Sequence, residues 1–109
     1  NSSMNNNTYK EQLVKGVLSL AVLSVLEQDE MYGAELLKKL ENTPFTTQAG
    51  TLYPLLNKMH KEGYITHRWQ TSDFGPARKY YQISATGKRH LVSLRAHWLA
   101  MTKVIKEQK

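Results

Sequence analysis

Six polar or basic side chains between Pro44 and Gly63 have the types expected of a helix face that contacts a polar partner. They are Thr47, Gln48, Thr51, Asn57, Lys58 and Lys61. Hydroxyl, amide and ammonium groups of this kind form hydrogen bonds with base edges and with phosphate oxygens. The opposite face of the same segment is apolar, with Leu52, Leu55, Leu56 and Met59. The pattern indicates a helix that packs with one side and offers the other to nucleic acid.

A second basic element, Arg78 and Lys79, follows a stretch rich in turn-forming residues at 70–77. The runs 64–69 and 79–83 are typical of strands, so the stretch between them is predicted to be the long, flexible tip of a hairpin. From this tip the two basic side chains would reach a neighbouring phosphate. Each phosphate that is neutralised releases counterions, so we expect binding to weaken steeply as salt rises.

The remaining elements position these two surfaces. Hydrophobic spacing predicts four helices, at about 9–26, 31–40, 49–62 and 86–107. Three helices, a hairpin and a long helix make a winged helix-turn-helix, mainly α with a small two-stranded β-hairpin wing (α+β). We expect a disordered tail or cloning remnant at 1–8, the DNA-binding domain at 9–85 and a C-terminal dimerisation helix at 86–109.

Length and composition restrict the classes of function. A chain of 109 residues has room for one domain, and its formal net charge of +6 favours a polyanionic partner. The absence of cysteine excludes a disulfide framework and thiolate metal sites, and it suggests a reducing cytoplasm. The longest apolar run, 17–26, is about half the length of a membrane-spanning helix. We therefore expect a cytoplasmic protein with no membrane partner.

Several segments resemble the PadR family of transcriptional regulators, and they occur in the family's order over nearly the whole chain. The matching segments are 31–36 (MYGAEL), 50–56 (GTLYPLL), 78–84 (RKYYQIS) and 86–87 (TG), together with Met59, Glu62, Gly63, Tyr64 and Ile65. They are similar to the opening of the family's second helix, its recognition helix, its second wing strand and the start of its last helix. Several motifs in one order are more specific than any single one.

The resemblance implies a homodimeric repressor that binds double-stranded DNA. We expect no cofactor. It places Tyr32, Tyr53 and the start of the third helix near the DNA. It also implies that the first and last helices pack against those of a partner, as in the compact subfamily with one C-terminal helix. The predicted DNA-binding residues are Tyr32, Thr47, Gln48, Thr51, Tyr53, Lys58, Arg78 and Lys79.

An apolar stripe along the last helix also favours a homodimer, because it is too continuous for a soluble monomer. With two residues of the first helix, it forms the predicted dimer interface: Leu13, Val17, Leu91, Leu94, Trp98, Met101 and Ile105. A twofold dimer would hold two recognition helices about one turn of DNA apart, roughly 34 Å, and would bind a palindromic operator.

Trp98, in the middle of this stripe, has two interpretations. The first is a packing residue, because an aromatic side chain at such a spacing usually belongs to a core. The second follows from the resemblance: in relatives that bind planar drugs, a tryptophan on this helix and its symmetry mate sandwich an aromatic compound. Leu94 and Met101 would then lie beside a planar aromatic effector, and a planar cation would gain stacking and cation–π attraction.

Two other classes of function stay open. The fold could serve as a protein-interaction module without DNA binding, or as a protein that sequesters small molecules. Polar Gln48 and Thr51 and basic Arg78 and Lys79 favour DNA, because a protein-docking face would expose apolar residues there. The four histidines are scattered, and no nucleophile, phosphate-loop or paired-carboxylate pattern occurs. We therefore predict neither a metal site nor an enzyme.

Overall fold

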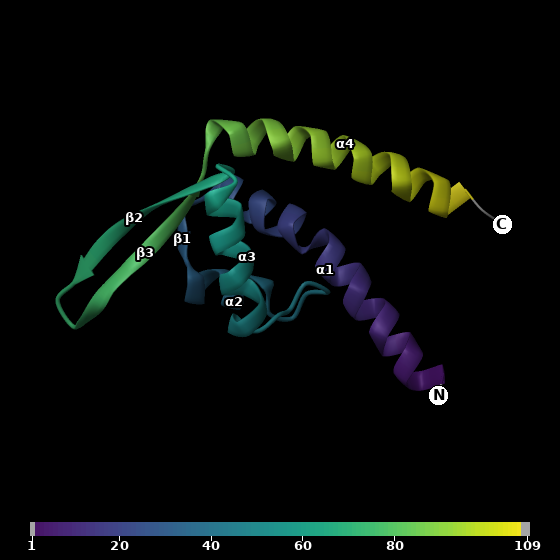
Figure 1. Ribbon diagram of the computed structural model, residues 1–109, viewed down its shortest axis with the longest axis horizontal. Coiled ribbons are helices and arrows are strands. Elements are labelled where there is room, and N and C mark those ends of the chain that lie inside the picture. The colour runs from purple at the N-terminus through teal and green to yellow at the C-terminus, as the bar shows by residue number, and fades with distance from the viewer. Residues whose placement is uncertain (1, 108–109) are drawn as a thin grey trace.

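A computed structural model describes residues 2–107 of the chain, with the side chains of residues 8–107. The elements are α1 (Ser2–Gln28), β1 (Met31–Tyr32), α2 (Gly33–Leu40), α3 (Ala49–Lys61), β2 (Ile65–Ser72), β3 (Gly75–Ile83) and α4 (Ala85–Glu107). The hairpin of β2 and β3 projects from one side of the molecule, and α1 and α4 diverge on the other (Figure 1). None of the described helices is long and apolar enough to cross a membrane.

The sheet has three antiparallel strands in the order β1-β3-β2, one more than predicted. The extra strand, β1, pairs with Tyr80 and Tyr81 of β3, where the sequence analysis placed the first turn of a helix. Two residues are too short to show a period, and only pairing with β3 fixes their extended form. α2 begins directly after them, where the backbone N–H of Tyr32 donates a hydrogen bond to Glu35 Oε1 at 3.1 Å.

Glu30, just before β1, ties the new strand to the hairpin. Its carboxylate accepts hydrogen bonds from the Arg68 guanidinium of β2 and from the Gln82 amide of β3. These two hydrogen bonds, that of Arg68 foremost, hold the pKa of the Glu30 carboxyl below its ordinary value. The contacts span 38 and 52 residues of sequence, so they explain why local pattern did not predict the strand.

The hairpin has a much shorter tip than predicted. β2 and β3 stay paired out to Ser72 and Gly75, so only Asp73 and Phe74 form the turn. The prediction of a long, flexible tip over 70–77 is therefore wrong. The two-residue connection keeps the strands side by side, with a register shift between Gln70 and Ser72, and it lets polar residues with weak strand preference join the ladder.

Helix α1 also begins earlier than expected. It runs from Ser2, so residues 2–8, which were predicted to be a disordered tail, are helical, and residue 1 lies outside the described part of the chain. Each Ser or Asn lowers helix stability by at most about 0.7 kcal/mol relative to Ala. No Pro or Gly interrupts this stretch, so the helix continues through it.

The hydrophobic core lies where the four helices meet the sheet. Fully buried leucines come from every helix: Leu18, Leu23, Leu36, Leu52, Leu56 and Leu91. The predicted inward stripe of α3 is confirmed, because Leu52, Leu56 and Met59 are buried and Leu55 packs against them. Leu91 belongs to this core and has no surface left for a partner, so its assignment to the dimer interface is wrong.

A tight corner joins the end of α3 to the start of α4. The Ser84 hydroxyl donates to the Gly63 carbonyl oxygen at 2.6 Å and accepts from the Gly87 N–H at 2.9 Å, so Ser84 caps α4. Gly63 has a φ of +84°, which favours glycine at the end of a helix. The Tyr64 and His90 rings stack, with centroids 4.0 Å apart. The corner therefore fixes α4 relative to α3.

Candidate nucleic-acid interface

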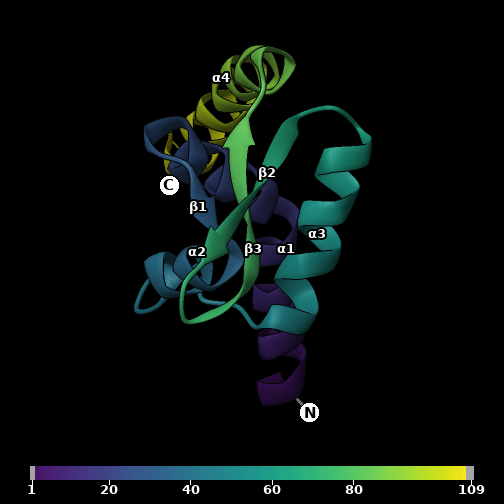
Figure 2. The same ribbon diagram turned by 90° about the vertical axis from the view of Figure 1, so that its left-hand side faces the viewer.

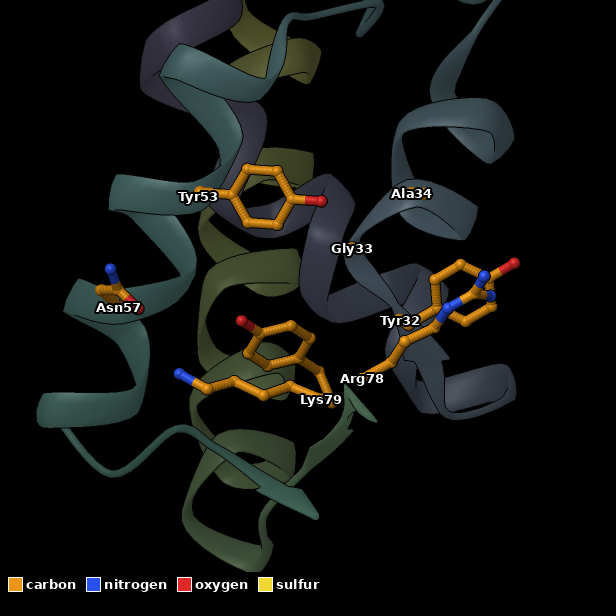
Figure 3. Close-up of a pocket in the computed structure, with 8 residues that line it drawn as sticks. Tyr32, Gly33, Ala34, Tyr53, Asn57, Arg78 and Lys79 are labelled. Atoms are coloured by element: carbon orange, nitrogen blue, oxygen red, sulfur yellow. The ribbon is translucent and has the colours of Figure 1, made fainter. Parts of the chain in front are cut away.

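A groove of about 520 Å³ lies between α3 and the inner part of the hairpin. Residues from α2, α3, β1 and β3 line it: Tyr32, Gly33, Ala34, Tyr53, Asn57, Arg78, Lys79 and Tyr81. Two of these are cationic and none is acidic. Figure 3 shows the Lys79 side chain extending toward Asn57, and the Tyr53 hydroxyl pointing toward Gly33. The groove therefore joins the predicted helix and wing into one polar, positive surface.

The position of the Tyr53 ring depends on Gly33, which it faces. A Cβ atom built on Gly33 would lie 2.3 Å from Tyr53 Cε1 and 2.5 Å from its hydroxyl oxygen, far inside van der Waals contact. Tyr53 is 39% exposed, so one edge of the ring is packed and the other faces solvent. Gly33 thus allows the ring to lie across the start of α2 and to form one wall of the groove.

Arg78 and Lys79 lie on opposite faces of the hairpin, because neighbouring residues of a strand alternate. Lys79 is on the side of α3, with its Nζ 5.4 Å from the centre of the Trp69 ring. Arg78 is on the side of β1, with its Cζ 4.5 Å from the centre of the Tyr32 ring. Both residues were predicted to reach a phosphate from the tip of the hairpin. Both instead line the groove where the hairpin meets the body (Figure 3). Figure 2 shows the hairpin of β2 and β3 with α3 beside it.

Three other predicted residues, Thr47, Gln48 and Thr51, line a second hollow, of about 480 Å³, between α1 and the amino end of α3. Its polar lining includes Lys10, Glu11, Lys15, Thr46, Thr47, Gln48 and Thr51. The structure thus separates Thr47, Gln48 and Thr51 from the residues beside the hairpin. Lys58 lines neither hollow and is exposed.

Sequence reasoning missed the two basic residues of α1. Lys10 and Lys15 were not in the predicted set, because the first helix was interpreted through its apolar residues alone. Asn57 was noted on the polar face of α3 but was not included in that set. Their polar or basic side chains were the only sign of them in the sequence. The structure brings them beside the predicted residues, because α1 and the hairpin both lie next to α3.

Comparison with known proteins decides the family of the chain. The model of the PadR-like transcriptional regulator family matches residues 22–93. The chain belongs to this family. It is 27% identical over 77 residues to the transcriptional regulator Rv3488 of Mycobacterium tuberculosis, which covers 71% of each protein. It is 36% identical over 56 residues to the transcriptional regulator YqjI of Escherichia coli, covering 49% of this chain. The match spans only 27% of the length of YqjI.

Solved PadR-like structures share the fold. The structure of a PadR family transcriptional regulator from Eggerthella lenta has a TM-score of 0.89 at 27% identity, covering 97% of this chain and 93% of that one. A PadR-like transcriptional regulator from Bacillus cereus has a TM-score of 0.80 at 35% identity, covering 90% and 99%. The PadR resemblance inferred from the sequence is therefore confirmed, and this chain has the fold of the solved PadR-like structures.

This PadR-like chain has a separate, mainly apolar hollow of about 490 Å³ between α1, α4 and the segment after α2. Its lining includes Val17, Leu20, Phe45 and Trp98, with Lys39 and Arg95 as the basic members. Of the two residues predicted to accompany Trp98, Leu94 packs against the core and Met101 is 44% exposed. Trp98 is half-buried, so part of its ring packs and part faces the hollow.

Two histidines that are separate in the sequence meet between α3 and β2 of this PadR-like chain. The ring centroids of His60 and His67 are 4.5 Å apart. Burial lowers the pKa of His67, and the positive charges of His60 and Lys79 lower it further. Among the described residues, no three metal-binding side chains lie close enough together to hold an ion. The pair therefore packs the hairpin against α3.

Lowering the pH from 7.5 to 5.5 is expected to destabilise the fold through His67. The unfolded chain binds this proton near the ordinary pKa of 6.5, whereas the folded chain binds it only at lower pH. The contribution of His67 to the free energy of unfolding is therefore fully present above pH 6.5 and is lost as the pH drops from that value through the lower pKa of the folded chain. Urea denaturation across this range measures the change, with a shallower dependence expected for His67→Gln. The exposed His97, changed to Gln, is the control, and equal pH dependence in both variants would contradict the assignment.

Proposed function

We propose that this PadR-like regulator is a homodimeric, ligand-responsive repressor that binds palindromic duplex DNA, with α3 in the major groove and the hairpin beside it. The observation that carries the proposal is the groove between α3 and β3. It brings the Asn57 amide, the Tyr53 hydroxyl and the Lys79 ammonium group together without an acidic residue. These are the groups that contact base edges and phosphates.

Gly50, near the amino end of α3, supports a close approach of DNA to this helix. A Cβ atom added there would meet no other atom within 4 Å, so packing within the chain does not require glycine. Glycine lowers helix stability by roughly 0.5–1 kcal/mol relative to alanine. We expect Gly50→Ala to raise stability by about that amount and to weaken duplex binding, as measured by urea denaturation and fluorescence anisotropy. Unchanged binding would show that no DNA approaches this position.

Gly33→Ala is expected to lower duplex affinity with little loss of stability. The added methyl group expels the Tyr53 ring from the groove wall, and a ring that is already 39% exposed can swing into solvent. An off-rotamer side chain costs only about 0.5–1.5 kcal/mol, so the fold should survive. Anisotropy titration alongside Tyr53→Phe tests the role of the hydroxyl. Normal affinity of Gly33→Ala would contradict a role for Tyr53 in binding.

Exposed apolar side chains on the diverging helices support the homodimer. Leu13 of α1 is 65% exposed, and Met101 and Ile105 of α4 are 44% and 71% exposed. Val17 and Trp98 are half-buried between them. The helices of a second copy would cover these side chains and place two α3 helices on one side of the dimer. A monomer mass at micromolar concentration in sedimentation would contradict this arrangement.

The hollow beside Trp98 supports an effector site, but its charges change the expected ligand. Two basic side chains, Lys39 and Arg95, line the hollow, and no acidic side chain lines it. Arg95 forms an ion pair with Glu27 of α1, with Arg95 Nη1 3.0 Å from Glu27 Oε1. A planar aromatic compound with an acidic group therefore fits better than the planar cation expected from the tryptophan alone. Titrating Trp69→Phe protein with each kind of compound isolates Trp98 fluorescence. No quenching by either compound would contradict the effector site.

Footprinting on the DNA upstream of the chain's own gene tests the proposed function. A dimer with two recognition helices should protect two patches about one helical turn apart, roughly 10 base pairs, with related inverted sequences. Protection of a single patch would contradict the palindromic operator. No protection at any site of that DNA, with binding to other proteins instead, would favour the protein-interaction module.

A further inference from the structure

The turn of the hairpin carries an aromatic side chain that this chain does not cover. Phe74 is 99% exposed, the highest value among the exposed large hydrophobic side chains. The turn between β2 and β3 stands clear of all four helices (Figure 1). Ser72 Oγ accepts a hydrogen bond from the Phe74 N–H at 3.3 Å, which helps to hold the turn in shape. One exposed aromatic residue is common on protein surfaces, so the role of Phe74 depends on the residues around it.

Charge is distributed unevenly along the hairpin. The cations Arg78 and Lys79 lie in its inner part, beside α2 and α3. Between Gln70 and Ala77, Asp73 is the single charged residue, and the others are hydroxyl, amide or apolar residues. Such a segment does not hold phosphates by charge. It suits the floor of a DNA groove, where base edges and sugars lie between the phosphate rows.

The length of the hairpin matches that placement. Lys79 and Asn57 face the same groove (Figure 3), so an α3 helix in the major groove brings Lys79 to the phosphates at its border. From Lys79 to Phe74 the chain covers five steps, at most roughly 16 Å at about 3.3 Å per residue. That distance passes one phosphate backbone and reaches the adjacent minor groove. A two-residue turn can enter this groove, which is only about 6 Å wide.

On the basis of the proposed DNA binding, we propose that Phe74 enters the minor groove beside each half-site as an apolar wedge, unstacks a base step and bends the duplex. Aromatic and aliphatic side chains of minor-groove proteins act in this way. A protein partner for the turn is disfavoured, because the cations of the same hairpin already point to a polyanion. Asp73 opposes entry through repulsion by the phosphates, so Asp73→Asn should bind duplex more tightly than wild type.

The test measures bending of the footprinted duplex by energy transfer between dyes at its two ends. Wild-type protein should bring the ends closer. Phe74→Ala should abolish most of this change and lower affinity about tenfold, with an unchanged salt dependence. Phe74→Leu keeps an apolar wedge and should retain most of the bend. Since Phe74 is 99% exposed, both variants should keep the circular dichroism of the wild type.

The outcomes separate this proposal from the one on which it rests. If Phe74→Ala binds and bends the duplex as wild type does, the wedge is overturned and DNA binding stands, and the turn is then free for a protein partner. If wild-type protein binds no duplex, both proposals are overturned. If Phe74→Ala loses the bend and Lys79→Glu loses affinity at all sequences, both are supported.

Discussion

Replacing Lys79 by glutamate is expected to weaken binding to every duplex by about 10- to 100-fold, whatever the sequence. Lys79 extends into the groove beside Asn57 (Figure 3), where we place a phosphate. Loss of a hydrogen bond between charged groups costs about 1.5–3 kcal/mol. The slope of log affinity against log salt should also become shallower by about one. Anisotropy titrations of labelled duplexes at several salt concentrations measure both quantities.

Gln48→Ala is the matched comparison, because Gln48 lies at the amino end of α3 and not on the hairpin. This variant should change the preferred sequence and leave the salt dependence unchanged, since contacts to base edges carry sequence information and contacts to phosphates do not. Arg78→Glu should act in the same direction as Lys79→Glu. Uniform weakening by Gln48→Ala, together with altered preference in Lys79→Glu, would contradict these roles.

Replacing Gly87 by alanine is expected to destabilise the folded chain by roughly 2–4 kcal/mol. The new Cβ atom would lie 2.0 Å from the Tyr64 carbonyl oxygen and 2.8 Å from Ile83 Cγ1. The first of these is a backbone atom of the turn between α3 and β2, so it cannot rotate away. Relief of the clash would pull α4 from the corner and strain the hydrogen bonds of Ser84. Urea denaturation at a fixed protein concentration measures the loss.

Gly50→Ala is the control for this substitution, because an added Cβ atom meets nothing within 4 Å there. The two alanine variants should shift stability in opposite directions, with Gly87→Ala below wild type and Gly50→Ala above it. A Gly87→Ala protein as stable as wild type would mean that α4 does not dock on the turn after α3 as described. The same variant should also bind DNA more weakly, since the corner positions both α3 and α4.

The sequence predicted α3 well, because a long amphipathic helix carries its own evidence. Leu52, Leu56 and Met59 repeat at helical spacing and are buried together, and Gly63 ends the segment with a positive φ. β1 left no comparable signal. It consists of two residues whose extended form depends on β3 and on the Glu30 contacts from distant strands. Tertiary pairing alone determines such an element.

The apolar stripe of α4 shows what hydrophobic spacing alone cannot predict. Leu91 and Ile105 fit one helical spacing, yet Leu91 is fully buried within the chain and Ile105 is 71% exposed. Hydrophobic spacing identifies the face that is to be covered, but it does not tell whether the same chain or a second copy covers it. Residues of this stripe before the point where α1 and α4 diverge are covered by the same chain, and residues after it are exposed (Figure 1). The position of that point depends on the fold.

The candidate interface was predicted in its chemistry but not in its arrangement. Tyr53, Arg78 and Lys79 do meet at one groove, although the flexible tip expected to carry the two basic residues is an ordered pair of strands. Their alternation on opposite faces follows from strand register, which a long loop would not have imposed. Thr51 lies with residues of α1 instead, because the direction of α1 relative to α3 is set by packing.

The most direct test of the account is the salt dependence of wild-type binding to duplex DNA. In fluorescence anisotropy, the protein should bind a labelled duplex from the region upstream of its gene, with log affinity falling linearly as log salt rises and a slope of several units. An unrelated duplex should bind more weakly with a similar dependence. Purified protein that leaves both duplexes unbound even at low salt would contradict the central claim that α3 and the hairpin form a DNA-binding surface.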